Sequence, residues 1–156
     1  MVLEYMQIEP GQGHIAGRAL LEKMYLAHTG EKIPKILVTD RGKPYFADGN
    51  LLFSISHTKN YVFCALSDSP IGIDAEEENR DIDLGLAEKI LSPSEKAQYQ
   101  NAMDKRTALL TFWVLKEAMA KFTGEGLRGY PNKTDFRLED PRVQKIGNCL
   151  VAVICK

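Results

Sequence analysis

The sequence lacks a surplus of either charge. Its 20 Lys and Arg residues stand against 21 Asp and Glu residues, so the formal net charge is -1. Proteins that bind nucleic acid or anionic membranes through their overall charge need an excess of basic residues on one face. The composition therefore argues against both partners, and we expect any phosphate group to be bound by a local set of side chains.

Cysteines and long apolar runs are also scarce. Cys64, Cys149 and Cys155 are the three cysteines, and they show neither CxxC nor Cys/His ligand spacing. This pattern predicts reduced thiols in a reducing compartment, and no disulfide framework or zinc site. The longest apolar runs, 61–66 and 149–155, are far shorter than the roughly 20 residues that cross a bilayer. With no secretory signal visible in the first residues, we expect a cytoplasmic protein.

The 156 residues are enough to bury a core in one domain. Apolar residues recur at helical spacing between residues 16 and 27, and Gly30 follows them, which predicts a helix over this stretch. The β-rich segment 36–39 predicts a strand. The runs LLFSIS at 51–56 and YVFCALS at 61–67 predict a hairpin.

The second half follows a similar plan. Ser92, Pro93 and Glu95 match a helix start, with Ser at the cap, Pro at the first helical position and Glu three residues after the cap. A longer amphipathic helix is expected from about 106 to 123, where Gly124 follows it. Further strands are expected at the runs IGIDAE, DFRLE and CLVAVIC, with an acidic linker after the first.

Helix followed by hairpin thus occurs twice. The order predicts an α+β fold of two similar helix-plus-antiparallel-sheet lobes related by a pseudo-twofold axis. We expect lobe one at about residues 1–70 and lobe two at about 71–156, within a single domain that covers 1–156.

Two carboxylates lie on the run IGIDAE. Strand side chains alternate between faces, so Ile71 and Ile73 are expected in the core and Asp74 and Glu76 together on the opposite face. Carboxylates that share a face repel each other unless a cation lies between them. Mg²⁺ prefers such hard oxygen ligands, with water and phosphate completing its shell. The alternative is a solvated strand end that continues into the acidic linker.

The long helix offers a second polar set. Glu117 and Lys121 are four residues apart and share a face, with Trp113 one turn earlier and Lys116 beside Glu117. An exposed pair of this kind is commonly surface decoration. The alternative is a phosphate site, in which one carboxylate holds a metal and two ammonium groups approach the phosphate oxygens.

A third set lies at the end of the first hairpin strand. Ser54 and Ser56 share a face, and His57 is expected at the exposed turn, after Lys43 in an earlier turn. Adjacent strand residues point to opposite faces, so Ser56 and His57 cannot form a nucleophile and base pair. Taken alone, a histidine or lysine in such a turn is more often an ordinary surface or packed residue than a ligand.

The segments GKPYF, FSISHT, IGIDAE and FWVLKEAMAKFTGEGL, in this order, resemble the 4'-phosphopantetheinyl transferase superfamily. The resemblance runs from about Arg41 to Leu127. Its specific part is the pairing of a Gly-x-Asp-x-Glu element with a Trp-x-x-Lys-Glu-x-x-x-Lys helix. It is similar to the surfactin-type group, which is pseudodimeric in one chain, in a short form.

The resemblance implies an enzyme, a holo-carrier-protein synthase. It would transfer the 4'-phosphopantetheine arm of coenzyme A to a serine of an apo acyl or peptidyl carrier protein and release adenosine 3',5'-bisphosphate. Asp74, Glu76 and Glu117 would hold Mg²⁺. Glu117 would also take the serine proton, and Lys121 would assist at the phosphate.

The resemblance also implies contacts with coenzyme A. Lys116 and Lys121 would contact phosphate oxygens, and Lys43, Ser56 and His57 would meet the phosphates of the nucleotide. Larger members carry basic residues nearer the N-terminus, whereas no Lys or Arg precedes Arg18 in this sequence. Arg18 is a further candidate phosphate contact, although no distinctive motif marks it.

Two other functions use the same residues. A metal-dependent phosphohydrolase acting on a nucleotide diphosphate would need the carboxylates but no carrier, and a noncatalytic carrier-binding module would keep the motifs without the reaction. Because two lobes in one chain would build the site internally, the expected state is a monomer.

Overall fold

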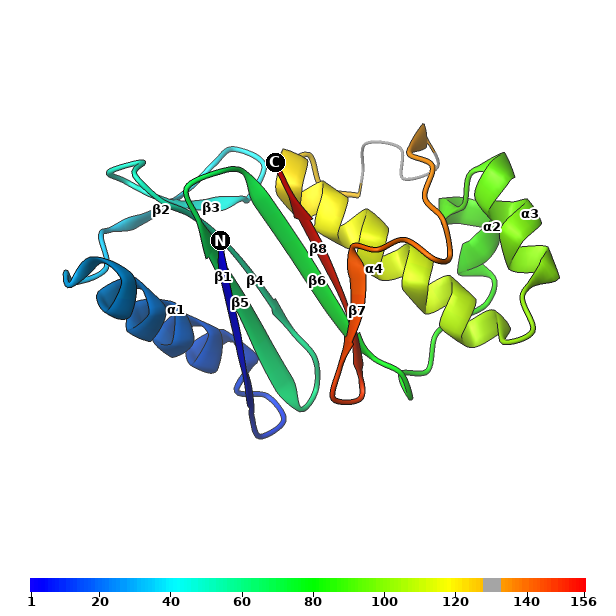
Figure 1. Ribbon diagram of the computed structural model, residues 1–156, viewed down its shortest axis with the longest axis horizontal. Helices are drawn as coiled ribbons and strands as arrows, with labels where there is room; N and C mark the ends of the chain where they lie inside the picture. The colour runs from blue at the N-terminus through cyan, green and yellow to red at the C-terminus, as the bar shows by residue number, and fades with distance from the viewer. Residues whose placement is uncertain (128–132) are drawn as a thin grey trace.

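Two three-stranded antiparallel sheets form the centre of the protein, and helices lie outside them (Figure 1). The computed structural model describes residues 1–127 and 133–156. The first half contains β1 (Val2–Gln7), α1 (Gly13–Thr29), β2 (Ile36–Val38), β3 (Pro44–Phe46), β4 (Leu52–His57) and β5 (Tyr61–Ser67). The second half contains β6 (Ile71–Glu77), α2 (Leu86–Ile90), α3 (Pro93–Asn101), α4 (Lys105–Thr123), β7 (Val143–Ile146) and β8 (Cys149–Cys155). The predicted α+β class is confirmed.

The two sheets share one strand plan. Their orders are β1-β5-β4 and β6-β8-β7, so in each the last strand of the chain segment lies between the other two. In each, a long helix, α1 or α4, separates the first strand from the hairpin that completes the sheet. The strands β2 and β3 pair with each other in a separate ribbon. The pseudo-twofold axis and the division of lobes near residue 70 stay predictions.

Local signals account for the helix boundaries. Gly30 and Gly124 end α1 and α4 in the left-handed conformation, which glycine adopts at low cost. At the start of α3 the Ser92 hydroxyl accepts a hydrogen bond from the Glu95 N–H while the Glu95 side chain accepts one from the Ser92 N–H. The predicted capping box is therefore confirmed.

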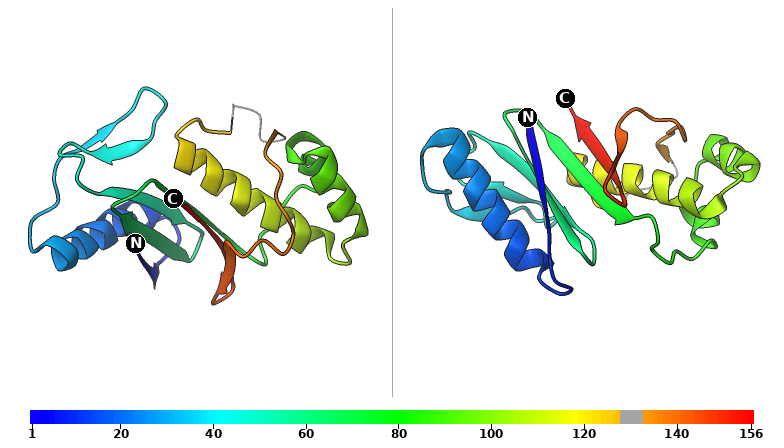
Figure 2. Two further views of the ribbon diagram at one scale, coloured as in Figure 1. Left: turned by 45° about the horizontal axis from the view of Figure 1, so that its top comes forward. Right: turned by 60° about the horizontal axis from the view of Figure 1, so that its bottom comes forward.

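Three apolar clusters hold the layers together. Leu21 and Met24 of α1 pack with Phe53 of the first sheet. A second cluster joins α4 to the outer face of the second sheet. A third cluster lies between the sheets and includes Phe63 of β5 and Ile73 of β6. The result is the sequence of layers visible in Figure 2, with α1 and α4 on the outer sides and both sheets between them.

The sheets meet at β4 and β6 through serine side chains. The Ser54 hydroxyl accepts a hydrogen bond from the Ile73 N–H at 3.0 Å, and the Ser56 hydroxyl accepts one from the Ala75 N–H at 3.2 Å. Because Phe53 on the other face of β4 packs against α1, these serines are directed toward β6. The carboxylates of β6 are thereby placed next to β4.

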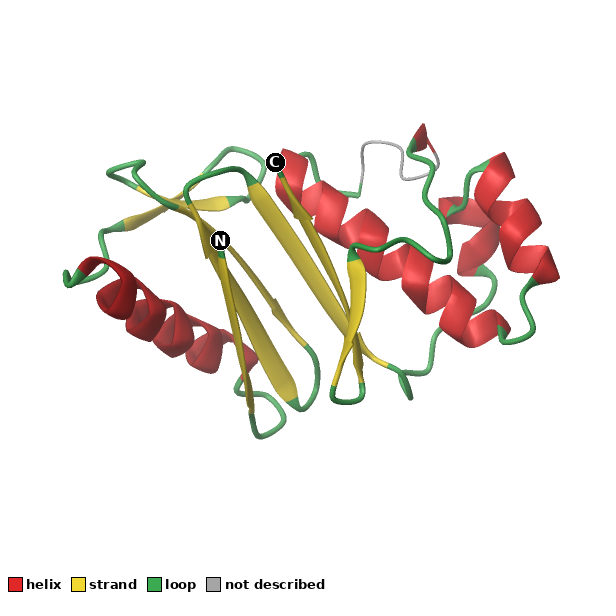
Figure 3. Cartoon of the chain, in the orientation of Figure 1, coloured by secondary structure: helices red, strands yellow, loops and turns green. Residues whose placement is uncertain are grey.

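The predicted strand at 135–139 is wrong. Figure 3 shows this segment as loop and turn. The Phe136 N–H donates to Glu95 Oε1 at 2.9 Å, and the Leu138 N–H donates to Gln98 Oε1 at 3.1 Å. These donors are bound by side chains of α3 and are not available to a strand ladder, and the hairpin partner of β8 is β7 instead. The strands β1, β3 and β7 and the short helix α2 were not predicted.

Across residues 1–127 and 133–156, no helix has the length and apolar character that crossing a membrane requires.

Gly72 permits the close approach of β6 to α4. A Cβ atom at this position would lie 2.1 Å from the Ala118 carbonyl oxygen and 2.3 Å from the Phe122 nitrogen. Both are backbone atoms, so neither can move aside without shifting the helix. We expect Gly72→Ala to lower the free energy of unfolding by roughly 3 kcal/mol, measured by urea denaturation.

Gly85→Ala is the matched control. Gly85 has a φ of -61°, and an added Cβ would meet only the flexible Asp83 side chain, at 3.1 Å. If both variants unfolded at the same urea concentration, the approach of β6 to α4 would not depend on glycine.

Candidate functional site

Side chains from β6 and α4 meet at one cavity. The outer face of β6 carries Asp74 and Glu76, while Ile73 and Ala75 belong to the cluster between the sheets. This agrees with the alternation predicted for IGIDAE. From α4, Trp113, Glu117 and Lys121 reach the same cavity, whose volume is about 480 Å³ and which we call the carboxylate cavity.

The three α4 side chains reach the cavity together because of helix geometry. They are four residues apart in succession, so they lie on one face, and the opposite side of α4 is buried in the core. The short distance between Gly72 and Ala118 brings that face against β6. The site is thus built by a strand and a helix whose positions are fixed by packing.

Asp74 is buried, with 6% of its surface exposed. Its Oδ1 accepts hydrogen bonds from the Ser56 hydroxyl at 2.9 Å and from Lys121 Nζ at 2.8 Å. Its Oδ2 is buried and has no hydrogen-bond partner within the described part of the chain. A buried carboxylate oxygen without a partner is rare in proteins and points to a bound group. The alternative of a solvated strand end is therefore wrong for this residue.

Glu76 lies between an aromatic donor and a cation. Its Oε1 accepts a hydrogen bond from Trp113 Nε1 at 3.2 Å and also contacts the Arg80 guanidinium. Burial raises the pKa of Glu76 to about 7, the charges of Asp74 and Glu117 add to the rise, and Arg80 and Trp113 oppose it.

Glu117 shares the field of the other two carboxylates. Burial, followed by the charge of Asp74, raises the pKa of Glu117, while Lys121 and Arg80 oppose the rise. Its side chain lines the carboxylate cavity and a smaller neighbouring one. The three carboxylates therefore concentrate negative charge at one place, which favours a cation there.

The carboxylate oxygens of Asp74, Glu76 and Glu117 fit a Mg²⁺ ion that is also bound by water and by a phosphate of the substrate. No group of three or more His, Cys, Asp or Glu side chains encloses a metal position among residues 1–127 and 133–156. Mg²⁺, however, is commonly bound by one or two carboxylates, with water and substrate phosphate completing the octahedron. Asp74 Oδ2 has no partner within the described residues, and the pKa values of Glu76 and Glu117 are raised, first by burial and then by the neighbouring carboxylates, whose repulsion a cation would relieve. These residues could hold such an ion.

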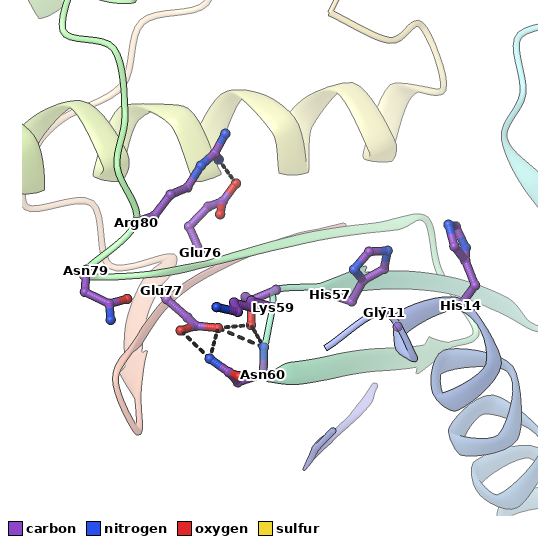
Figure 4. Close-up of a pocket in the computed structure, with 11 residues that line it drawn as sticks. Gly11, His14, His57, Lys59, Asn60, Glu76, Glu77, Asn79 and Arg80 are labelled. Carbon is purple, nitrogen blue, oxygen red and sulfur yellow. Dashed lines mark hydrogen bonds and ion pairs between the residues drawn. The ribbon is translucent and has the colours of Figure 1, made fainter. Parts of the chain in front are cut away.

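A second cavity continues from the first. Its volume is about 730 Å³. It is lined by Gly11, Gly13 and His14 around the start of α1 and by the turn between β4 and β5, and we call it the histidine cavity. The rings of His14 and His57 meet edge to face, with centroids 5.0 Å apart. A Cβ at Gly13 would lie 2.5 Å from the His57 ring, so glycine allows this contact. Figure 4 shows the cavity with both histidines and Lys59.

The turn after β4 is held by Glu77. This buried carboxylate accepts hydrogen bonds from Thr58 Oγ1 at 2.7 Å and from the Asn60 N–H at 2.9 Å, as well as from the Asn60 amide (Figure 4). Burial alone would raise the pKa of Glu77, but these hydrogen bonds outweigh it and lower the pKa. The turn that carries His57 and Lys59 is therefore fixed to the end of β6.

Lys43, Ser56 and Arg18 are placed differently. Lys43 lines a cavity of about 270 Å³ with Glu117 and Lys121, and its Nζ donates to the Phe122 carbonyl at 2.6 Å. The Ser56 hydroxyl already donates to Asp74 and accepts from a β6 N–H. Arg18 is exposed on α1, forms an ion pair with Glu22 at 3.2 Å, and lines none of these three cavities.

Lys116 does not reach the carboxylate cavity, so the expectation that it and Lys121 approach a common point is wrong. Its side chain is 3% exposed and forms an ion pair with Glu95 at 2.8 Å. Its Nζ also donates to the Thr134 carbonyl and lies over the Phe136 ring. Since successive helix residues are rotated by about 100°, Lys116 and Glu117 project toward different sides of α4.

Among the residues that line the cavities, Arg80, His14 and Glu77 were given no role by the sequence analysis. A signal was present for Arg80, which is the one basic residue between Asp74 and Asp83. A basic residue in the acidic segment after β6 can form an ion pair with a carboxylate of β6 if the chain turns back on itself.

Comparisons with known proteins find one family. The profile of the "4'-phosphopantetheinyl transferase superfamily" matches residues 70–150, which include the strand, the helix and the loop of the site. A "4'-phosphopantetheinyl transferase gsp" from Aneurinibacillus migulanus is 28% identical over 80% of this chain and 54% of its own length. "HetI" from a Nostoc species is 33% identical over 72% and 52%, and "psf-1" from Bacillus pumilus 34% over 74% and 49%. The chain spans about half the length of the curated relatives it matches.

The buried Glu95–Lys116 pair should be important for stability. Glu95 also binds the N–H groups of Ser92 and Phe136, so it joins α3, α4 and the loop before β7. Glu95→Gln would remove the negative charge that pairs with the buried Lys116 ammonium group. We expect the free energy of unfolding to fall by about 3 kcal/mol in urea titrations.

Lys96→Gln supplies the comparison on the same helix. Lys96 pairs with Glu88, whose side chain is 77% exposed, so we expect a change of less than about 0.5 kcal/mol. Equal losses in the two variants would show that burial does not determine the strength of the Glu95 pair.

The raised pKa of Glu76 should make stability depend on pH. An unfolded Glu titrates near pH ~4.3, whereas folded Glu76 has a pKa of about 7. Between these values the folded protein retains a proton that the unfolded chain has released. The free energy of unfolding should therefore fall as the pH rises through this window, by roughly 1 to 3 kcal/mol for this group.

Urea titrations at pH 5 and pH 7.5 measure this effect. Glu76→Gln cannot ionise, so the loss between the two pH values should be smaller in the variant than in the wild-type protein. An equal loss in both proteins would contradict the assignment to Glu76.

Proposed function

The chain belongs to the 4'-phosphopantetheinyl transferase superfamily, and from this premise we propose that it transfers the 4'-phosphopantetheine arm of coenzyme A to a serine of an apo acyl or peptidyl carrier protein. The product released would be adenosine 3',5'-bisphosphate. The observation that supports this proposal most strongly is the convergence of Asp74, Glu76, Glu117 and Lys121 on one cavity. These are the residues of the two motifs that define the resemblance.

The three carboxylates would repel the phosphates of coenzyme A, so the cavities can bind this substrate only when cations balance the negative charge. Asp74, Glu76 and Glu117 would hold Mg²⁺, for which their oxygen donors fit. When bound, the ion would offset the negative charge of the diphosphate as the leaving phosphate departs. On the protein side, Lys121 would stabilise the phosphate oxygens, and His57 and Lys43 would orient the nucleotide from the two neighbouring cavities.

The reaction requires a proton acceptor for the serine hydroxyl. A bond forms between the serine oxygen and the phosphorus of the phosphopantetheine group, and the bond from that phosphorus to the bridging oxygen of the diphosphate breaks. Glu117 would take the serine proton, because it is a half-buried carboxylate whose pKa is raised toward the range of a general base. Its position on a packed helix keeps it beside the phosphate region.

A single chain would suffice for this reaction. The carboxylate cavity is lined from α1, β4, β6 and α4, so both halves of the same chain contribute. We therefore propose a monomer. The three free cysteines, two of them buried, agree with a reducing environment, and we propose a cytoplasmic location on that ground.

Mass spectrometry of an apo carrier protein tests the function directly. After incubation with coenzyme A and Mg²⁺, the carrier should gain roughly 340 Da, the mass of the transferred arm. A release of phosphopantetheine in the absence of carrier would indicate a phosphohydrolase. Binding of the carrier without any mass gain would indicate a noncatalytic module.

Glu117→Gln is expected to lower turnover by about a hundredfold or more. The substitution keeps the shape and an oxygen atom but removes the charge that serves both the metal site and proton transfer. Turnover would be measured by the same mass assay at saturating coenzyme A and Mg²⁺, with circular dichroism to confirm the fold.

Glu125→Gln is the control. Glu125 lies just beyond α4, is exposed, pairs with Arg41 at 3.6 Å, and lines none of the three cavities. We expect little change. Near wild-type turnover by Glu117→Gln would exclude Glu117 as the base.

A further inference from the structure

Arg80 lies where the two large cavities join. It lines both the carboxylate cavity and the histidine cavity, together with Gly13, His14, His57 and Glu76. It follows β6, and its N–H donates to the Glu77 carbonyl at 2.9 Å in the turn that ends the strand. This turn directs the side chain back toward Glu76, as Figure 4 shows.

Two contacts hold the guanidinium over the site. One Nη atom bonds to Glu76 Oε1, and the guanidinium carbon lies 5.6 Å from the centroid of the Trp113 ring. The side chain is 37% exposed, so it retains access to the open side of the cavities. A guanidinium is planar, so its remaining N–H donors can bind an oxyanion while the group lies over an aromatic ring.

The site contains two ion pairs between a β6 carboxylate and a basic side chain. Lys121 Nζ binds Asp74 Oδ1 at 2.8 Å, and Arg80 binds Glu76. Each of the β6 carboxylates expected to hold Mg²⁺ is therefore paired with one basic side chain. A complex of Mg²⁺ with a diphosphate would offer a cation to the carboxylates and phosphate oxygens to the two basic groups, so both pairs could exchange partners without loss of charge balance.

We propose that Arg80 binds the diphosphate of coenzyme A and leaves Glu76 to do so, as the counterpart of Lys121 on the other side of the carboxylate cavity. This inference rests on the proposed function and adds a binding residue that lies outside the motifs of the family resemblance. Arg has the advantage over Lys that its planar fork can donate two parallel hydrogen bonds to one phosphate.

Calorimetric titration without carrier protein tests the assignment. Arg80→Gln should weaken the binding of coenzyme A, in the presence of Mg²⁺, by roughly ten- to a hundredfold. The binding of 3'-dephospho-coenzyme A should weaken by the same factor, because this ligand keeps the diphosphate. A loss confined to coenzyme A would assign Arg80 to the 3'-phosphate and overturn the proposal, as would unchanged binding of both ligands.

An indirect effect through Glu76 is tested by a second pair of variants. If Arg80 only neutralised Glu76, its removal would have no effect once Glu76 is uncharged. We expect Arg80→Gln to weaken coenzyme A binding severalfold or more in a Glu76→Gln background as well. No difference between the single variant Glu76→Gln and the double variant would refute direct contact.

The control is Arg106→Gln, an exposed arginine in the first turn of α4 that lines none of the three cavities. It should bind both ligands as the wild-type protein does. If the wild-type protein failed to bind coenzyme A, the proposed function would fall. If it bound coenzyme A and Arg80→Gln bound equally well, only the role of Arg80 would fall.

Discussion

The contact between β6 and α4 at Gly72 is the constraint on which the site depends. Because glycine has no side chain, the strand approaches the backbone of Ala118 and Phe122 more closely than another residue would allow. The same register that buries Ile73 between the sheets then directs Asp74 and Glu76 toward Glu117 and Lys121. The serine side chains of β4 hold the other edge of β6 and contribute a hydrogen bond to Asp74 itself. The strand β6 therefore both packs the sheets against α4 and carries two of the carboxylates of the site.

Negative charge is concentrated here at a cost that the surrounding cations reduce. Asp74 is paired with Lys121 and Glu76 with Arg80, whereas Glu117 is influenced by both cations from a greater distance. Burial still holds the pKa values of Glu76 and Glu117 above the ordinary range. A site of this kind is arranged for a ligand that carries both signs of charge, since a simple anion would be repelled and a bare cation would leave Lys121 and Arg80 without partners.

Features that depend on neighbours in the chain were predictable from the sequence. The capping box at Ser92, the end of α1 at Gly30 and the alternation around Asp74 follow from residues a few positions apart, and each is present. Features set by distant partners were not predictable. The segment 135–139 has the composition of a strand, yet side chains of α3 bind its N–H groups. Lys116 is buried only because Glu95 of α3 faces it.

The adjacent residues Lys116 and Glu117 show how one motif can serve two purposes. Lys116 is directed into the protein, where its pair with Glu95 joins α4 to α3 and to the loop before β7. Glu117, one residue further, is directed into the carboxylate cavity. A change at Lys116 would therefore act first on the packing of α4 against α3. Sequence similarity at this dipeptide cannot separate the two roles, because the rotation between neighbouring helix residues places them in different environments.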